Sequence, residues 1–220
     1  MPSTRLLATC VLAGALFAGR PASAQTAGDA PPGDASQRGG PVLRLRVGPA
    51  YLGASIGFGE IPDRSYSGGG FAFDVEIGGA LSPNVTLGAE VFGALALDAS
   101  TNGSANAAFG ESPTADLSTA GVGPSVTYTF RRFDQGNIYF ATNPAFTIVR
   151  TSDPDHFFLA KDWGSNHFGV GIAFVVGAEW HVSSGWRLGP VLEARYAAVS
   201  GNGDVSTMSE YALLFSATYD

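Results

Sequence analysis

Residues 167–196 constrain the fold more than any other stretch, because apolar side chains stand at every second position through two successive runs. The first run ends at Trp180 and the second begins at Trp186, while the alternate positions carry mostly glycine, alanine or charged residues. Since neighbouring side chains of a β-strand point to opposite faces, the pattern predicts a hairpin with one apolar wall and one small or charged wall. The length and uniformity of the apolar wall indicate that it meets lipid.

The composition favours the same interpretation. Charged residues make up only 14% of the chain, against about 25% in typical soluble proteins, while the hydrophobic content of 45% is ordinary. No run of about 20 apolar residues follows the N-terminus, so we do not expect membrane-spanning helices. A protein that contacts lipid through strands fits both observations.

The N-terminus predicts export across a membrane. Residues 1–24 combine Arg5, an apolar stretch and the sequence Ala22-Ser23-Ala24, as in a cleaved signal peptide. Residues 25–40 have no periodicity and predict a disordered leader, which leaves residues 41–220 for a barrel domain. Removing the signal would also remove the single cysteine, Cys10, so no disulfide or cysteine chemistry is expected.

The charge of the mature chain argues against nucleic acid as a partner. Without the two arginines of the predicted signal, ten basic residues face 19 acidic residues, a net charge of −9. Proteins that bind nucleic acid through its phosphates are basic.

Alternation with period two recurs eight times in the predicted barrel domain, in residues 42–58, 69–80, 85–97, 119–130, 138–149, 167–180, 186–196 and 208–219. In the first run Gly48-Pro49 predicts a β-bulge, after which Leu52, Ala54 and Ile56 would face outward. The connections alternate between short turns (81–84, 131–137, 181–185) and mostly longer loops (59–68, 98–118, 151–166, 200–207). Such asymmetry is typical of transmembrane barrels, with turns on the periplasmic side and loops outside. We therefore predict an all-β fold, an eight-stranded antiparallel up-and-down transmembrane β-barrel.

Together with the export signal, these runs resemble the small eight-stranded outer-membrane barrels of Gram-negative bacteria, of the OmpA/OmpX-like type. The resemblance covers residues 41–220, and the alternating strand from Tyr211 to Tyr219 looks like the signal that the barrel-assembly machinery reads. In that group the chain normally ends on the aromatic residue, whereas Asp220 follows it here. The resemblance implies the bacterial outer membrane as location, with lipid and lipopolysaccharide around the barrel and the assembly machinery as a partner during insertion.

Ten charged residues fall on the face opposite the apolar wall, and we predict that they line the lumen as paired structural charges. A barrel of eight strands is just wide enough for side chains to fill it, and buried charges must be paired. Placing Trp180 opposite Trp186 predicts that Glu179 faces Arg187. The turn at 81–84 brings Glu90 near Asp74 or Glu76, which requires Arg44, Arg46 or a shared proton. The ten residues are Arg44, Arg46, Asp74, Glu76, Glu90, Glu179, Arg187, Glu193, Arg195 and Glu210.

No residue pattern predicts a catalytic, cofactor or metal site. Ser165 and His167 at a loop–strand boundary suggest a lipid hydrolase only weakly, since a catalytic triad is defined by geometry. Acidic residues in the loops could share divalent cations with lipopolysaccharide, but a solvated rim is the simpler interpretation. They are Glu60, Asp63, Asp98, Glu111, Asp116, Asp153, Asp155 and Asp162.

The sequence thus predicts an integral outer-membrane barrel without enzymatic activity, either structural or interacting through its loops. Three alternatives remain open: a narrow porin-like pore of low conductance, a lipid-modifying enzyme at the outer leaflet, and a soluble ligand-binding barrel.

Overall fold

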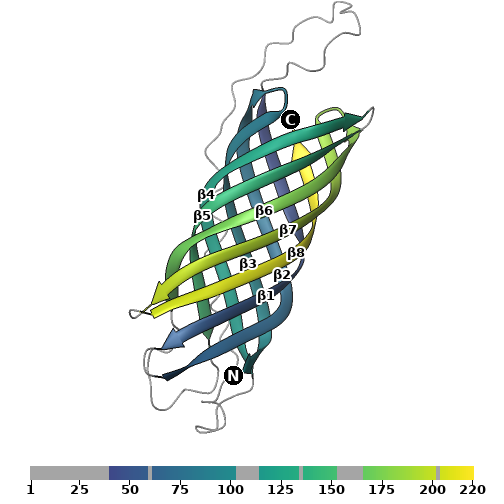
Figure 1. The fold of residues 1–220 in the computed structure, drawn as a ribbon. Coiled ribbons are helices and arrows are strands. Elements are labelled where there is room, and N and C mark those ends of the chain that lie inside the picture. Colours follow the sequence, from purple (N-terminus) through teal and green to yellow (C-terminus); the bar gives the residue numbers. More distant parts are fainter. Residues whose placement is uncertain (1–39, 59–60, 103–113, 134–135, 153–165, 202–203) are drawn as a thin grey trace, which may run out of the picture. The chain divides into compact units, whose positions relative to one another are not determined.

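Eight antiparallel strands close into one barrel in chain order, with β8 paired to β1 (Figure 1). The structure, a computed structural model, describes residues 40–58, 61–102, 114–133, 136–152, 166–201 and 204–220. The predicted signal peptide and all but the last residue of the predicted leader lie outside these residues and stay predictions. The strands are β1 (Pro41–Phe58), β2 (Ile61–Ser82), β3 (Val85–Asn102), β4 (Thr114–Phe133), β5 (Gly136–Ser152), β6 (Asn166–Ser183), β7 (Trp186–Gly201) and β8 (Asp204–Tyr219). The predicted eight-stranded up-and-down barrel is confirmed. Among the residues described, no helix is long and apolar enough to cross a membrane.

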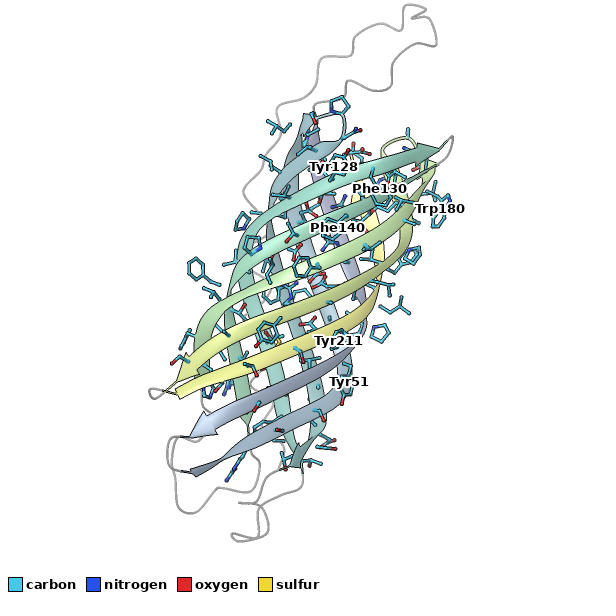
Figure 2. The ribbon with its side chains drawn as sticks, viewed as in Figure 1. Tyr51, Tyr128, Phe130, Phe140, Trp180 and Tyr211 are labelled. Carbon is cyan, nitrogen blue, oxygen red and sulfur yellow. The ribbon has the colours of Figure 1, made fainter. Side chains whose placement is uncertain are left out.

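The outer wall is apolar on every strand and the inner wall carries the charges. On β8, Tyr211, Leu213 and Phe215 are more than half exposed, whereas Glu210, Ala212 and Leu214 at the alternate positions are buried. Figure 2 shows Phe130, Trp180 and other aromatic side chains pointing away from the barrel. A soluble barrel has the opposite arrangement, since its apolar side chains must leave water. The soluble alternative is therefore disfavoured.

The strands are longer than the membrane requires, which corrects two predicted loops. They contain between 16 and 22 residues, so at a rise of about 3.3 Å and a tilt of about 45° they stand roughly 37–51 Å tall. The apolar band of an outer-membrane barrel is only about 25 Å tall. Most of the expected loops 59–68 and 200–207 belong to β2, β7 and β8 instead. Pairing beyond the membrane satisfies backbone groups that an open loop would leave to water.

The predicted bulge at Gly48-Pro49 is absent. β1 keeps one register with β2 from Pro41 to Ile56 and one with β8 from Leu43 to Ser55. Leu52 and Ile56 therefore face the lumen, where both are fully buried. The apolar residues that suggested a change of phase are instead the filling of one part of the barrel interior.

The predicted register of the β6–β7 hairpin is also wrong, by two residues. Trp180 pairs with Leu188, and Trp186 pairs with Ser183. The strands continue into the expected turn, because only two residues, Ser184 and Gly185, form the turn itself. Gly185 adopts a φ of 84°, a left-handed conformation that glycine accepts without steric cost. Glu179 therefore does not lie opposite Arg187.

Candidate functional site

The barrel interior holds nine of the ten charged residues assigned to it from the sequence. All nine are at most 4% exposed, and they come from β1, β2, β3, β6, β7 and β8. They form two connected groups around three arginines, Arg44, Arg46 and Arg195. The alternation of each strand positions them, since every second side chain of a closed barrel must enter the lumen.

The first group surrounds Arg44 on β1. Its Nη1 atom donates to Glu76 Oε2 at 2.6 Å, and its Nε atom lies 3.3 Å from Glu179 Oε1. Glu179 Oε1 also accepts hydrogen bonds from the hydroxyl groups of Ser216 at 2.8 Å and Thr218 at 2.7 Å. One guanidinium thus joins carboxylates of β2 and β6, and two hydroxyls stabilise the second carboxylate further.

The second group is built on Arg46 and is denser. Arg46 Nη2 donates to Glu76 Oε2 at 2.7 Å, which connects this group to the first. Its Nη1 atom lies 3.0 Å from Glu90 Oε2, 3.5 Å from Asp74 Oδ2 and 3.8 Å from Glu193 Oε2. Three carboxylates therefore surround a single nitrogen that carries only two hydrogens.

Arg195 on β7 approaches the same three carboxylates through their other oxygens. Its Nη2 atom donates to Glu193 Oε1, lies 3.2 Å from Glu90 Oε1 and is 3.6 Å from Asp74 Oδ1. Glu210 is the most distant partner, with Oε2 4.0 Å from Arg195 Nε. The sequence predicted a carboxylate pair with Arg44 or Arg46, and the structure places Arg195 there as well.

Two buried aromatic rings accompany the arginines, and sequence reasoning missed both. The guanidinium carbon of Arg44 lies 4.5 Å from the Tyr139 ring centroid, and that of Arg195 lies 3.3 Å from the Phe92 ring centroid. Both rings are nearly inaccessible. Each stands at an inward position beside a large apolar residue that faces outward, Val91 next to Phe92 and Phe140 next to Tyr139, and this inward position was the available signal. A cation above a ring gains electrostatic stabilisation when both are removed from water.

The remainder of the lumen is filled mainly by apolar side chains. Leu52, Ile56, Leu117, Val149 and Met208 are at most 1% exposed and belong to one buried cluster. A packed layer of this kind leaves few voids larger than a water molecule. The interior therefore consists of a charged part and an apolar part along the same barrel.

Arg187 does not take the place predicted for it. It pairs with His181 in the β6–β7 ladder, and its Nη2 atom donates to Asp220 Oδ2 at 2.6 Å. The Asp220 side chain is 38% exposed. The two-residue shift of the hairpin register moves Arg187 towards the barrel end, where the last residue of the chain becomes its partner. The predicted pairing of Arg187 with Glu179 was wrong, whereas Arg187 stays on the same face of β7 as Glu193 and Arg195, with its side chain 12% exposed.

The candidate hydrolase residues Ser165 and His167, and the two other histidines of the chain, are only partly described. His167 lies at the start of β6, is 2% exposed and faces the lumen, whereas His181 is exposed near the β6–β7 turn. Ser165 and His156 lie outside the described residues, as do most of the acidic loop residues named above. Within the described part of the chain, no group of three or more histidine, cysteine, aspartate or glutamate side chains is arranged to hold a metal ion.

The apolar exterior, the closed eight-stranded ladder and the charged interior define an outer-membrane β-barrel. The family model for the outer membrane protein β-barrel domain matches residues 10–219, and the chain belongs to this family. Membership implies a location in the bacterial outer membrane. No curated protein sequence matches the chain.

Three solved structures with similar folds are distant in sequence. Neisserial surface protein A is 13% identical, with a TM-score of 0.53, covering 80% of this chain and 96% of its own. The protein AlkL in lipid bilayers is 17% identical, with a TM-score of 0.47, and the match covers 88% of this chain and 95% of AlkL. The attachment invasion locus protein Ail of Yersinia pestis, in complex with a heparin analogue, is 10% identical, with a TM-score of 0.43, covering 81% and 99%. At these identities the first likeness supports the fold alone.

Proposed function

We propose that this protein is a closed outer-membrane barrel, a stable membrane anchor that acts through its extracellular loops rather than through its lumen. The observation that carries the proposal is the filling of the interior. Arg46 and Arg195 tie charged residues of four strands together, and the apolar layer around Leu52 and Leu117 occupies another part of the same lumen. A solute would have to displace both.

The charged groups have a structural role in this proposal and no catalytic one. Each arginine is held by at least two carboxylates within 4 Å, and the carboxylate Glu76 joins Arg44 to Arg46. Charges fixed in such a network are not free to activate a water or a substrate. The enzyme alternative would need a separate site at the extracellular end.

The membrane partners follow from the surface and the family. Lipid would cover the apolar wall, and lipopolysaccharide would meet the extracellular end in the outer leaflet. The strand β8 would be read by the assembly machinery during insertion, with Asp220 following the terminal aromatic Tyr219. The predicted signal peptide would supply the export step.

Electrical recording tests the closed lumen against the pore alternative. In planar bilayers the purified protein is expected to give no steady conductance, because two filled layers lie in series. Arg195→Ala should remain silent as well, since it empties part of the charged layer and leaves the apolar layer around Leu52 intact.

A defined single-channel conductance of the wild-type protein would overturn the closed lumen. A change in its ion selectivity in Arg195→Ala would place the conducting path among the lumen charges and establish the pore. A large unrelated porin recorded in the same bilayers serves as the positive control.

A further inference from the structure

The lumen contains more negative than positive charge, and this excess needs a counter-charge. At the level of the network, Arg44, Arg46 and Arg195 supply three positive charges. Six buried carboxyl groups face them, so full ionisation would leave a net charge of −3. These six are Asp74, Glu76, Glu90, Glu179, Glu193 and Glu210. An uncompensated buried charge is strongly destabilising, because no partner replaces the water that it has lost.

The excess is confined to one part of the network. Arg44 is balanced by Glu179, and Arg46 forms its shortest contact with Glu76 at 2.7 Å. Four carboxyl groups, which we call the acidic cluster, then share Arg195 and the remaining donor of Arg46. The acidic cluster consists of Asp74, Glu90, Glu193 and Glu210.

Hydrogen bonding is incomplete within the acidic cluster, as it also is at Glu179 Oε2 and at the Nε and Nη1 atoms of Arg195. Glu210 Oε2, Glu193 Oε2 and Asp74 Oδ2 are buried and accept no hydrogen bond. The Glu210 side chain is 2% exposed and has its nearest cation 4.0 Å away. A carboxylate oxygen in this position lacks a donor, whereas a protonated carboxyl group supplies one itself.

We propose that the acidic cluster binds at least one proton in the folded barrel at neutral pH, shared among its four carboxyl groups. The proton balances part of the excess charge and donates a hydrogen bond to an oxygen that has no other donor. Because the groups interact strongly, the proton belongs to the cluster and not to one residue. This goes beyond the closed lumen, which would hold with or without it.

Besides Arg44, Arg46 and Arg195, the described strands bury one further arginine, Arg64 on β2, which stands opposite Ile56 in the apolar part of the lumen. Arg195 is already shared, and β4 contributes only the hydroxyl groups of Ser125 and Thr127, both directed at Glu76. No metal-binding arrangement is present in the described strands. The charged or titratable groups that face the cluster are Arg44 and Arg46 from β1, Glu76 from β2, Tyr139 from β5, Glu179 from β6 and Arg195 from β7.

The proposal predicts how the stability of the folded barrel changes with pH. In the unfolded chain, carboxyl groups release their protons above about pH 5, so the folded state binds more protons near neutrality. Lowering the pH from about 8 to about 6 should therefore favour the folded state, by about tenfold in the folding constant per pH unit for each proton bound. The urea midpoint of the full-length protein in detergent micelles, measured across this range, checks this directly.

The variant Glu210→Gln tests whether the acidic cluster binds a proton or whether its carboxyl groups have only a structural role. It removes one excess negative charge, so the pH dependence should weaken by about tenfold per pH unit, and the variant should be the more stable protein at high pH. Glu179→Gln is the matched control, because Glu179 lies in the balanced part of the network. It should lose stability at every pH while keeping the wild-type slope.

Infrared spectroscopy gives a second readout that does not depend on any variant. The folded wild-type barrel should show the carbonyl band of a protonated carboxyl group at neutral pH, and the band should disappear on unfolding. Absence of the band, or equal slopes for the wild-type protein and Glu210→Gln, would overturn the proposal. So would a midpoint that depends on the choice between sodium, potassium and choline but not on pH, since the counter-charge would then be an inorganic cation.

Discussion

Arg46→Ala is expected to destabilise the barrel by about 3–5 kcal/mol, the usual cost of removing one partner from a buried ion pair. Arg46 lies within 4 Å of carboxylates on β2, β3 and β7, whereas Arg44, the other arginine of β1, contacts carboxylates on β2 and β6. Its loss would leave two positive charges against six carboxyl groups. The temperature at which the folded band disappears in gels run without boiling should fall, together with the urea midpoint in micelles.

Arg150→Ala is the control for this experiment. Arg150 is exposed near the end of β5, and surface substitutions of this kind usually change stability by no more than about 0.5 kcal/mol. Equal behaviour of the two variants would contradict the central position that we give to Arg46.

Gly189→Val is expected to prevent the barrel from closing between β6 and β7. A Cβ atom at position 189 would stand 1.8 Å from the Ala178 carbonyl oxygen, and both atoms belong to paired strands. The backbone cannot move aside as a flexible side chain does, so the strands would have to separate. The free energy of unfolding should fall by more than about 4 kcal/mol. The heat-modifiable folded band should be absent.

Gly69→Ala tests whether this effect is specific to the close approach. Gly69 lies on β2, and a Cβ atom there would meet nothing within 4 Å. This variant should give the folded band at the wild-type temperature. A normal folded band for Gly189→Val would mean that β6 and β7 are farther apart than the structure places them.

The alternation of side chains was sufficient to predict the fold and the position of most lumen charges. Each assignment of a residue such as Glu90 or Glu193 to the interior requires only that neighbouring side chains point to opposite faces. That rule is local, so it does not depend on how the strands pair. The same pattern distinguishes a membrane barrel from a soluble one, because the charged side chains lie on the inner wall and the apolar side chains on the outer wall.

Register could not be predicted from the same pattern. A slip of one residue would exchange the two faces, but a slip of two residues leaves every side chain on its own face. The hairpin of Trp180 and Trp186 is displaced from the prediction by two residues. The partner of Glu179 therefore changed while its face did not, and Arg187 moved towards the barrel end.

The misplaced bulge in β1 has a different cause. Leu52 and Ile56 are apolar and were assigned to the lipid, which required a change of phase at Gly48-Pro49. The interior of this barrel is itself partly apolar, so hydrophobicity alone does not identify the outer face. Loop limits failed for a related reason, since Gly and Ser residues of strands extending beyond the membrane look like turn residues.

Nitroxide side chains placed along β8 test most directly whether the apolar wall meets lipid and the charged wall is closed. In a chain carrying Cys10→Ser, single cysteines at Tyr211, Leu213 and Phe215 would be labelled before refolding into vesicles. A further cysteine at Ala212 would be offered the label only after folding.

The account predicts frequent collisions of the three outward labels with dissolved oxygen and rare collisions with a water-soluble nickel complex. It predicts no labelling of the inward cysteine at position 212, a site that is 6% exposed, until the barrel is unfolded. Outward labels that meet the nickel complex freely, or an inward cysteine that reacts in the folded protein, would contradict it.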